Sequence, residues 1–271
     1  MADPNAPVDP GYEALYEEFD SPLMQQLRME AYGDDFGQHS WVTAAELESC
    51  MQGLGLTASS RLLDLGCGPG GPLTFVVSRV RCRAIGVDLS HAAVAAARNR
   101  AVGQGLGALV LLQQADANRP IPFVGRSFDA VMSMDTVLHL RDRTALFREV
   151  ARVLISNGKF WFTDAAVVTG PVSSQEVGLR SMHGYTQFVP SGFNEEALDD
   201  AGFRLIRIED RTAALLNNAS GRLTARQAHR AQLEQVEGPP YFERQLRYLE
   251  TVIALAERGA TSRVSYLAER R

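Results

Sequence analysis

One segment of the chain combines glycines and a single acid in the way that nucleotide-binding turns do. A short apolar run, residues 61–65, carries Asp64 and passes directly into Gly66, Gly68 and Gly70. This order is typical of a buried strand that turns into a helix while its backbone passes close beneath a ligand. The glycine spacing also matches the fingerprint of dinucleotide-binding folds, so it leaves more than one nucleotide ligand open.

Acids also follow the later apolar runs that read as strands. One acid lies at the end of each run or just after it. These acids are Asp64, Asp88, Asp116, Asp135 and Asp164. The carboxyl ends of parallel strands meet at one edge of a sheet, which is where ligands bind. These residues therefore predict a cleft lined by carboxylates.

The charge of Asp64 distinguishes between the possible ligands. A pyrophosphate binds at a helix N-terminus through free N–H groups, and a carboxylate just before the glycine turn repels it. The same carboxylate attracts the α-ammonium group of S-adenosylmethionine. Asp88, at the end of the next strand, accepts hydrogen bonds from ribose hydroxyls of either ligand. The residues therefore favour S-adenosylmethionine over a nicotinamide dinucleotide.

Several segments resemble the motifs of one enzyme family. Residues 62–70 look like the first motif of class I S-adenosylmethionine-dependent methyltransferases, and residues 86–90 are similar to their second. Residues 115–117 resemble the adenine-contacting motif, while residues 127–131 and 152–158 resemble the fourth strand and the helix-to-strand turn after it. The resemblance implies an enzyme that uses S-adenosylmethionine to methylate another molecule.

The resemblance also implies which residues contact the cofactor. They come from the glycine turn, the end of the second strand, the adenine-contacting motif, the end of the fourth strand and an N-terminal loop that folds across the donor in relatives. In this chain they are Asp64, Gly66, Gly68, Gly70, Asp88, Leu89, Asp116, Ala117, Met134 and Gln38.

A histidine after the fourth strand bears on the reaction. Residues 129–140 are similar to the small-molecule branch of the family, which includes sugar O-methyltransferases and glycine or sarcosine N-methyltransferases. Only the second member of their histidine pair, His139, is present. A base is needed only when the acceptor must lose a proton, and a histidine suits that task near neutral pH. The resemblance implies that His139 is a general base and that Asp164 orients it or binds the acceptor.

Three further residues are expected to contact the acceptor. Tyr16 lies in an N-terminal segment that could close over the site. His183 and Tyr185 lie in an irregular stretch, about residues 165–190, that is too long for an ordinary connection and reads as a lid. So much inserted chain predicts a covered pocket for a small molecule.

The elements that must position these residues alternate along the chain. Strands alternating with helices predict an α/β fold with a doubly wound, mostly parallel sheet, and the resemblance implies seven strands with an antiparallel last one. That strand, residues 263–268, is expected at an edge because a helical insertion, about residues 212–258, precedes it. Residues 1–59 read as helices forming part of a cap, and residues 60–271 as the methyltransferase domain.

The composition limits the partners. The 271 residues are 45% hydrophobic and include 27 basic and 32 acidic side chains. No apolar run approaches the roughly 20 residues of a membrane span, and no basic run interleaved with aromatics offers a surface for nucleic acid. Neither the histidines nor Cys50, Cys67 and Cys82 have metal-ligand spacing, and an odd number of scattered cysteines fits reduced thiols. We therefore expect no membrane or nucleic-acid partner and no metal. We also expect a cytoplasmic monomer or homodimer. The preference for arginine over lysine is typical of a GC-rich bacterial genome.

The sequence thus favours a methyltransferase that acts on O, N or C of a small metabolite, in secondary metabolism. Two alternatives stay open. A methyltransferase-like protein with a cyclase or other non-methylating role would keep every cofactor motif. A nicotinamide-dependent oxidoreductase would keep the glycine turn but is disfavoured by Asp64.

Overall fold

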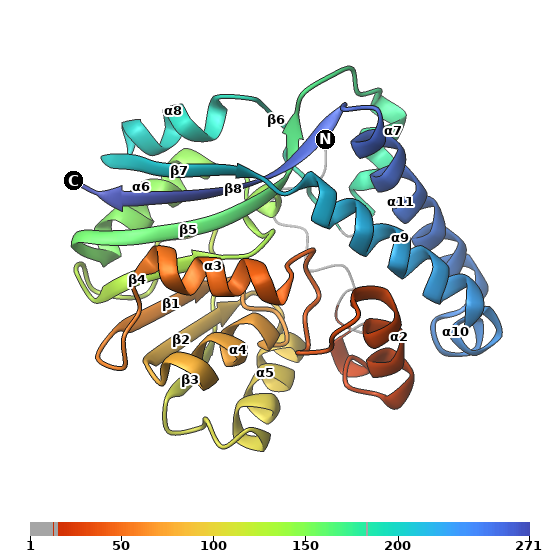
Figure 1. The fold of residues 1–271 in the computed structure, drawn as a ribbon, viewed down its shortest axis with the longest axis horizontal. Coiled ribbons are helices and arrows are strands. Elements are labelled where there is room, and N and C mark those ends of the chain that lie inside the picture. Colours follow the sequence, from red (N-terminus) through yellow and green to blue (C-terminus); the bar gives the residue numbers. More distant parts are fainter. Residues whose placement is uncertain (1–12, 14–15, 183) are drawn as a thin grey trace.

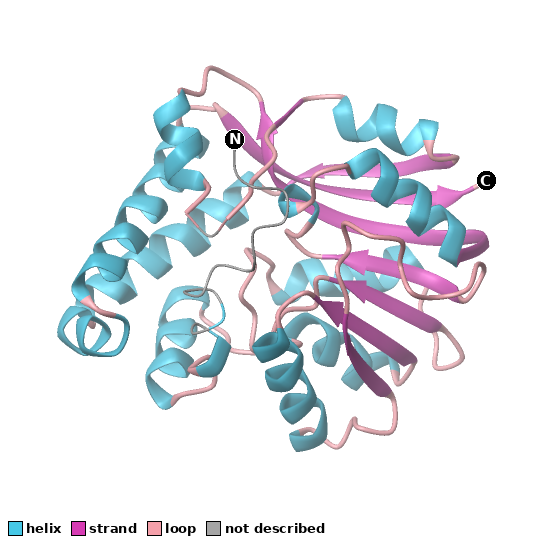
Figure 2. Ribbon diagram, turned by 180° about the vertical axis from the view of Figure 1, so that it is seen from behind, coloured by secondary structure: helices cyan, strands magenta, loops and turns pink. Residues whose placement is uncertain are grey.

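A central β-sheet lies between layers of helices, and a group of further helices stands beyond one end of the sheet (Figures 1 and 2). The computed structural model describes residues 13, 16–182 and 184–271. The strands are β1 (Arg61–Leu65), β2 (Arg83–Asp88), β3 (Val110–Gln114), β4 (Phe128–Ser133), β5 (Leu154–Val168), β6 (Val189–Pro190), β7 (Phe203–Asp210) and β8 (Thr261–Arg270). The helices are α2 (Pro22–Tyr32), α3 (Ala44–Leu54), α4 (Gly71–Val80), α5 (His91–Gly103), η1 (Val137–His139), α6 (Arg143–Val153), α7 (Ser174–Arg180), α8 (Phe193–Asp200), α9 (Thr212–Ala228), α10 (Arg230–Glu237) and α11 (Pro239–Glu257).

The strand order is β3-β2-β1-β4-β5-β8-β7, with β6 paired to β5. Neighbours among β1 to β5 are parallel, and β8 is antiparallel to both β5 and β7. The predicted mostly parallel, doubly wound α/β sheet with an antiparallel last strand is therefore confirmed. The sheet has eight strands instead of the expected seven, because the chain returning from the lid lays the two residues of β6 along the far end of β5.

Both faces of the sheet are buried because side chains alternate along each strand. Leu62 and Met132 pack with α3, α4 and α5 on one face, whereas Leu63 and Val131 pack with α6 and α8 on the other. Strands covered by helices on both sides read as apolar runs without alternation of polar residues. This explains why the strands were recognisable in the sequence.

The expected position of the last strand is wrong. β8 lies inside the sheet between β5 and β7, and β3 and β7 form the two ends of the strand order. Tyr266, Leu267 and Ala268 in β8 are all buried. An interior position lets the backbone of this apolar strand form hydrogen bonds along both edges. The inserted helices α9 to α11 do not block this position, because they stand beyond the ends of the strands (Figure 1).

The N-terminal helices divide between core and cap. Thr43 and Glu46 form a capping box at the start of α3, and α3 packs on the sheet through Leu47 and Cys50. α2 instead packs against α9, where Gly221 lets the two helices approach closely: a Cβ at this position would lie 2.1 Å from the carbonyl oxygen of Ala31. The cap therefore contains α2 but not α3, and most of the chain before residue 16 lies outside the described residues.

The remaining cap helices come from the two insertions. The expected lid contains a short helix, α7, which packs on α11. The helical insertion forms three helices, α9 to α11, and the chain bends at His229 between α9 and α10. Trp41, Leu215 and Leu249 share one apolar cluster that joins the N-terminal loop to α9 and α11. Among the described residues, every helix falls short of the length or apolar character that crossing a bilayer requires.

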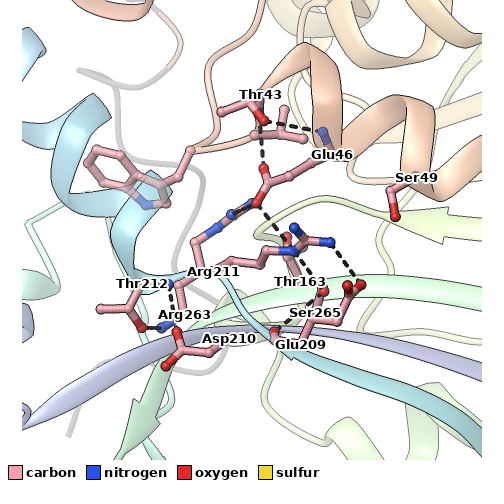
Figure 3. A network of polar contacts seen from close by, with 12 residues as sticks. Thr43, Glu46, Ser49, Thr163, Glu209, Asp210, Arg211, Thr212, Arg263 and Ser265 are labelled. Carbon is pink, nitrogen blue, oxygen red and sulfur yellow. Dashed lines mark hydrogen bonds and ion pairs between the residues drawn. The ribbon is translucent and has the colours of Figure 1, made fainter.

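A buried polar network fastens the cap to the sheet (Figure 3). Arg263 of β8 is fully buried and donates from Nε to Asp135 Oδ1 at 2.9 Å and from Nη1 to Glu46 Oε1 at 2.7 Å. The Thr163 hydroxyl also donates to Asp135 Oδ1, at 2.8 Å. Asp135 Oδ2 accepts from the backbone N–H of Trp41 at 2.9 Å. The network thus joins β8, α3 and the end of β4 to the N-terminal loop, whose Trp41 packs with the cap helices α9 and α11.

Replacing Arg263 with Met should destabilise the protein strongly, because Asp135 would remain buried without its cation and Glu46 would keep only Arg211, whose Nε lies 3.8 Å from Glu46 Oε1. Breaking a buried pair in this way costs about 3–5 kcal/mol, and urea denaturation followed by circular dichroism measures the loss. Arg204→Met is the matched control, since Arg204 pairs with Glu269 but its side chain is 61% exposed, and an exposed pair contributes at most about 1 kcal/mol. Equal losses in the two variants would contradict the assigned role of the network.

Candidate active site

A cavity of about 720 Å³ opens at the carboxyl ends of the parallel strands, beneath the cap. Its wall is formed by the glycine turn, the loops after β2, β3 and β4, the helical turn η1, the lid, α9, α11 and the N-terminal loop. Asp64, Asp88, Asp116 and Asp135 all line it. The predicted grouping of acids at one edge of the sheet is confirmed for these four residues.

The glycine turn presents its backbone to the cavity. Gly66 and Gly68 have φ of 72° and 52°, and both line the cavity. A Cβ on Gly66 would lie 2.2 Å from Thr136, so a side chain is excluded there. Gly70 is also left-handed, but it does not line the cavity, and a Cβ on it would lie 2.8 Å from Cβ of Ala97 in α5. The prediction that Gly70 contacts the cofactor is therefore wrong, because this glycine serves the packing of α4 against α5.

Asp64 is a buried carboxylate with an unsatisfied oxygen. The residue is 1% exposed, and its Oδ1 has no hydrogen-bond partner among the described residues. Burial, together with the nearby charge of Asp88, holds the pKa of Asp64 well above its usual range. A buried acceptor without a donor is costly, so this end of the cavity suits a ligand that brings a cationic N–H group.

The other cofactor residues lie around the same end of the cavity. Leu89, Asp116, Ala117 and Met134 line the cavity with Asp88. The Asp88 carboxylate accepts from Gly68 N and Ser90 N, each at 2.9 Å, which fixes its position at the end of β2. Burial raises the pKa of this carboxyl, although these two N–H donors oppose the shift.

Gln38 is not placed to contact a cofactor. Its amide oxygen accepts from Phe36 N at 3.0 Å and its amide nitrogen donates to the Asp34 carbonyl at 2.8 Å. The residue is 1% exposed and does not line the cavity. The predicted role is therefore wrong, because the side chain holds the turn of the N-terminal loop.

His139 lies at the end of η1 with its ring exposed toward the cavity. Its Nδ1 lies 3.0 Å from the Tyr185 carbonyl oxygen. A carbonyl oxygen only accepts, so Nδ1 carries the proton and, in the neutral ring, Nε2 has the free lone pair. The surrounding protein lowers the pKa of His139 by desolvation, and the positive charge of Arg180 adds to this effect, while the Tyr185 carbonyl opposes it. The ring is therefore neutral at pH 7 and able to accept a proton.

Asp164 does not take the predicted role beside His139. It is fully buried and does not line the cavity. Its Oδ2 accepts from Arg143 and, at 2.9 Å, from Asn194, while Oδ1 accepts from Ala166 N at 2.9 Å. The prediction that Asp164 orients His139 or binds the acceptor is wrong, because its carboxylate is occupied in an ion pair that anchors α6 and α8 to β5.

Two of the three predicted acceptor residues line the cavity. The Tyr16 hydroxyl lies 3.4 Å from His39 Nδ1, and the Tyr16 ring is buried. Tyr185 is 37% exposed and its ring lies 5.6 Å from the Arg141 guanidinium. Both residues line the cavity, whereas His183 lies outside the described residues.

Sequence reasoning missed part of the wall. Trp41 stacks on Tyr248 with ring centroids 6.4 Å apart, and both rings also line the cavity. Arg180 and Arg222 line it too. These residues come from the lid, from two inserted helices and from a loop, and no local motif marks them. Among the described residues, no group of three or more histidines, cysteines, aspartates or glutamates could hold a metal ion.

The fold and this site together suit a protein that binds a cationic nucleoside cofactor at the glycine turn and a second molecule beneath the cap. Proteins similar to this chain support the same class of protein. Residues 63–162 match a family described as a methyltransferase domain. A sarcosine/dimethylglycine N-methyltransferase of Halorhodospira halochloris is 31% identical over 195 residues, which cover 70% of this chain and 68% of that enzyme. The chain belongs to the class I S-adenosylmethionine-dependent small-molecule methyltransferases.

Other similar proteins differ in length or in chemistry. Phosphoethanolamine N-methyltransferase 1 of Triticum aestivum is 32% identical over 163 residues, which cover 60% of this chain but only 32% of that enzyme. The chain thus spans about a third of the length of this relative. The crystal structure of the [4+2]-cyclase SpnF has a TM-score of 0.75 at 21% identity and covers 97% of this chain and 98% of its own. At that identity the likeness establishes the fold alone.

Replacing Asp64 with Asn should weaken binding of S-adenosylhomocysteine, because the variant keeps the shape and loses the charge. A hydrogen bond to a charged group contributes about 1.5–3 kcal/mol, so the loss in affinity should be about 10- to 100-fold. Isothermal titration calorimetry measures it. Since the pKa of Asp64 is raised, a falling pH protonates the carboxyl and should also weaken wild-type binding, while the variant loses this dependence.

Asp129→Asn is the matched control for this experiment. Asp129 lies near the start of β4, and the cavity lies beyond the other end of that strand. The Asp129 carboxylate pairs with Arg61 at 3.1 Å. Its replacement should leave the affinity unchanged. Unaltered binding in Asp64→Asn, or the same loss in both variants, would show that Asp64 does not hold the cofactor.

Proposed function

We propose that this protein transfers the methyl group of S-adenosylmethionine to an oxygen, nitrogen or carbon atom of a small metabolite. The observation that carries the proposal is Asp64, a buried carboxylate with an unsatisfied oxygen at the end of β1, facing the cavity. Such a group repels the phosphates of a nicotinamide dinucleotide and attracts the α-ammonium of S-adenosylmethionine. The oxidoreductase alternative is thereby disfavoured.

The residues around the glycine turn fit this cofactor. Asp64 would hold the ammonium group, Asp88 the ribose hydroxyls, and Asp116 with Ala117 the adenine edge, while Gly66 and Gly68 leave room for the backbone to approach. Met134 and Leu89 supply apolar surface on the same side of the cavity. When bound, S-adenosylmethionine supplies an electrophilic methyl group on a sulfonium centre.

The protein contributes position and, where needed, a base. Acceleration of methyl transfer comes largely from orientation. The cap helices stand beyond the strand ends (Figure 1), and α7, α9 and α11 form part of the cavity wall in which an acceptor would be held. We assign His139 Nε2 as the atom that accepts a proton from an acceptor O–H or N–H. The Tyr185 carbonyl fixes the tautomer that this requires.

A second function on the same scaffold is a cyclase that retains the cofactor without transferring its methyl group, since the [4+2]-cyclase SpnF shares the fold along nearly the whole chain. One experiment separates the two. The purified protein is incubated with S-adenosylmethionine and a panel of sugars, amines, amino acids and polyketide-like metabolites. A methyltransferase forms S-adenosylhomocysteine together with a product heavier by one methyl group, whereas a cyclase forms an isomer and no S-adenosylhomocysteine.

The composition of the chain bears on its cellular setting. We propose a bacterial, cytoplasmic protein of secondary metabolism, a monomer or homodimer without a nucleic-acid partner. Cys50, Cys67 and Cys82 are all buried and without disulfides, which suits a reducing compartment.

Replacing His139 with Ala should lower kcat by about 10²- to 10⁴-fold for an acceptor that must lose a proton, while the affinity for S-adenosylhomocysteine stays unchanged. In the wild type, kcat/KM should fall as the pH decreases through a pKa below the usual 6.5 of histidine, because the ring must be neutral. Initial rates of S-adenosylhomocysteine formation between pH 5 and 8 measure both effects.

His229→Gln serves as the control for this profile. His229 pairs with Glu30 at 3.0 Å and does not line the cavity, so its replacement should leave the pH dependence as it is. Wild-type turnover in His139→Ala with a hydroxyl or ammonium acceptor would remove His139 from the mechanism.

A further inference from the structure

The charged side chains of the cavity wall come from the strand ends and from the cap. Asp64, Asp88 and Asp116 lie at the ends of β1 to β3 or just after them, Arg141 lies on the loop after η1, and Arg180 and Arg222 come from the lid and α9 in the cap. The acids at the strand ends are explained by a cationic cofactor. The basic residues of the cap lie in the part of the wall that the acceptor would contact.

Arg180 differs from the other buried arginines. The described residues include five arginines in the buried class, Arg28, Arg143, Arg180, Arg226 and Arg263. Four of them form ion pairs with carboxylates, namely with Asp35, Asp164, Glu237 and, for Arg263, both Glu46 and Asp135. Arg180 is 4% exposed, and no carboxylate of the described residues forms an ion pair with it.

The contacts of Arg180 are with uncharged groups. Its Nη1 donates to the Tyr248 hydroxyl at 3.0 Å and its Nη2 donates to the Ala165 carbonyl at 2.9 Å. The guanidinium also lies 5.4 Å from the Tyr248 ring. These contacts orient the side chain without neutralising it, and a buried cation that lacks a counter-charge is costly. The cavity on which it borders offers the space for an anion.

Arg222 extends this positive wall. Its guanidinium lies 4.8 Å from the Trp41 ring, and Trp41 stacks on Tyr248. The two arginines therefore flank a pair of stacked aromatic rings, and all four residues line the cavity. Asp135 also lines the cavity, but its carboxylate is already bound by Arg263, Thr163 and the Trp41 N–H.

We propose that the acceptor of this enzyme carries an oxyanion, a carboxylate or a phosphate monoester, which Arg180 binds within the cap while Arg222 adds positive potential. The inference rests on the proposed function, whose acceptor it describes. A guanidinium fork matches both oxyanions in geometry. Arg180 and His139 line the same cavity, and the positive charge of Arg180 contributes to lowering the pKa of His139. An oxyanion bound by Arg180 would weaken the repulsion between Arg180 and a protonated ring.

The test uses the full chain saturated with S-adenosylhomocysteine, whose binding is measured first by calorimetry. Sodium phosphate and sodium acetate are then titrated separately as probes at constant ionic strength. We expect at least one anion to bind, with its dissociation constant raised about tenfold or more in Arg180→Gln and less in Arg180→Lys, which keeps the charge. Phosphate binding alone points to a phosphate monoester, and acetate binding alone points to a carboxylate.

Two further variants control the experiment. Arg247→Gln removes an exposed arginine of α11 that does not line the cavity, and it should leave anion binding unchanged. Arg222→Gln should weaken anion binding by a smaller factor than Arg180→Gln. If circular dichroism shows that the Arg180 variants fail to fold, the oxyanion assignment is tested by Arg222→Gln, and unchanged anion binding in that variant would overturn it.

The outcomes separate the two proposals. Absence of S-adenosylhomocysteine binding would overturn the proposed function. If S-adenosylhomocysteine binds but neither anion does, or if the Arg180→Gln and Arg247→Gln variants bind the anion equally well, the oxyanion assignment is overturned while the methyltransferase proposal stands.

Discussion

The arrangement of the site depends on the carboxylate of Asp135. This residue follows β4 in a left-handed conformation, with φ of 50°, and its two oxygens bind a strand on one side and the N-terminal loop on the other. Because Arg263 and Glu46 complete the same network, α3, β8 and Trp41 are held at fixed positions relative to the strand ends. The cap is thereby anchored above the glycine turn, and the cavity exists between two parts of the chain that are far apart in sequence.

Within this cavity the balance of charge explains the chemistry. Most buried charges of the protein are neutralised by partners on neighbouring elements, as Arg143 and Asp164 show. Asp64 and Arg180 are buried at its wall and form no ion pair among the described residues. Asp64 suits the ammonium group of the methyl donor, and Arg180 suits an oxyanion of the acceptor. In the proposed mechanism His139, held in one tautomer by the Tyr185 carbonyl, accepts the proton that the acceptor loses.

Much of the fold and the donor half of the site could be predicted from the sequence, because their signals are local. The capping box at Thr43, the apolar strands and the glycine turn each lie within a few consecutive residues. The errors arose where position depends on distant packing. Gly70 faces α5 and Asp164 faces Arg143, although both follow the expected spacing, and β8 enters the sheet between two strands. Arg180 and Tyr248 carry no local signal at all, since helical periodicity does not tell a cavity from a core.

The most direct test of this account is a calorimetric titration of the protein with S-adenosylmethionine and, separately, with NADH. The account predicts that S-adenosylmethionine binds at one site per chain and that NADH does not bind, because Asp64 favours a cation and opposes a pyrophosphate. Binding of NADH without binding of S-adenosylmethionine would contradict it.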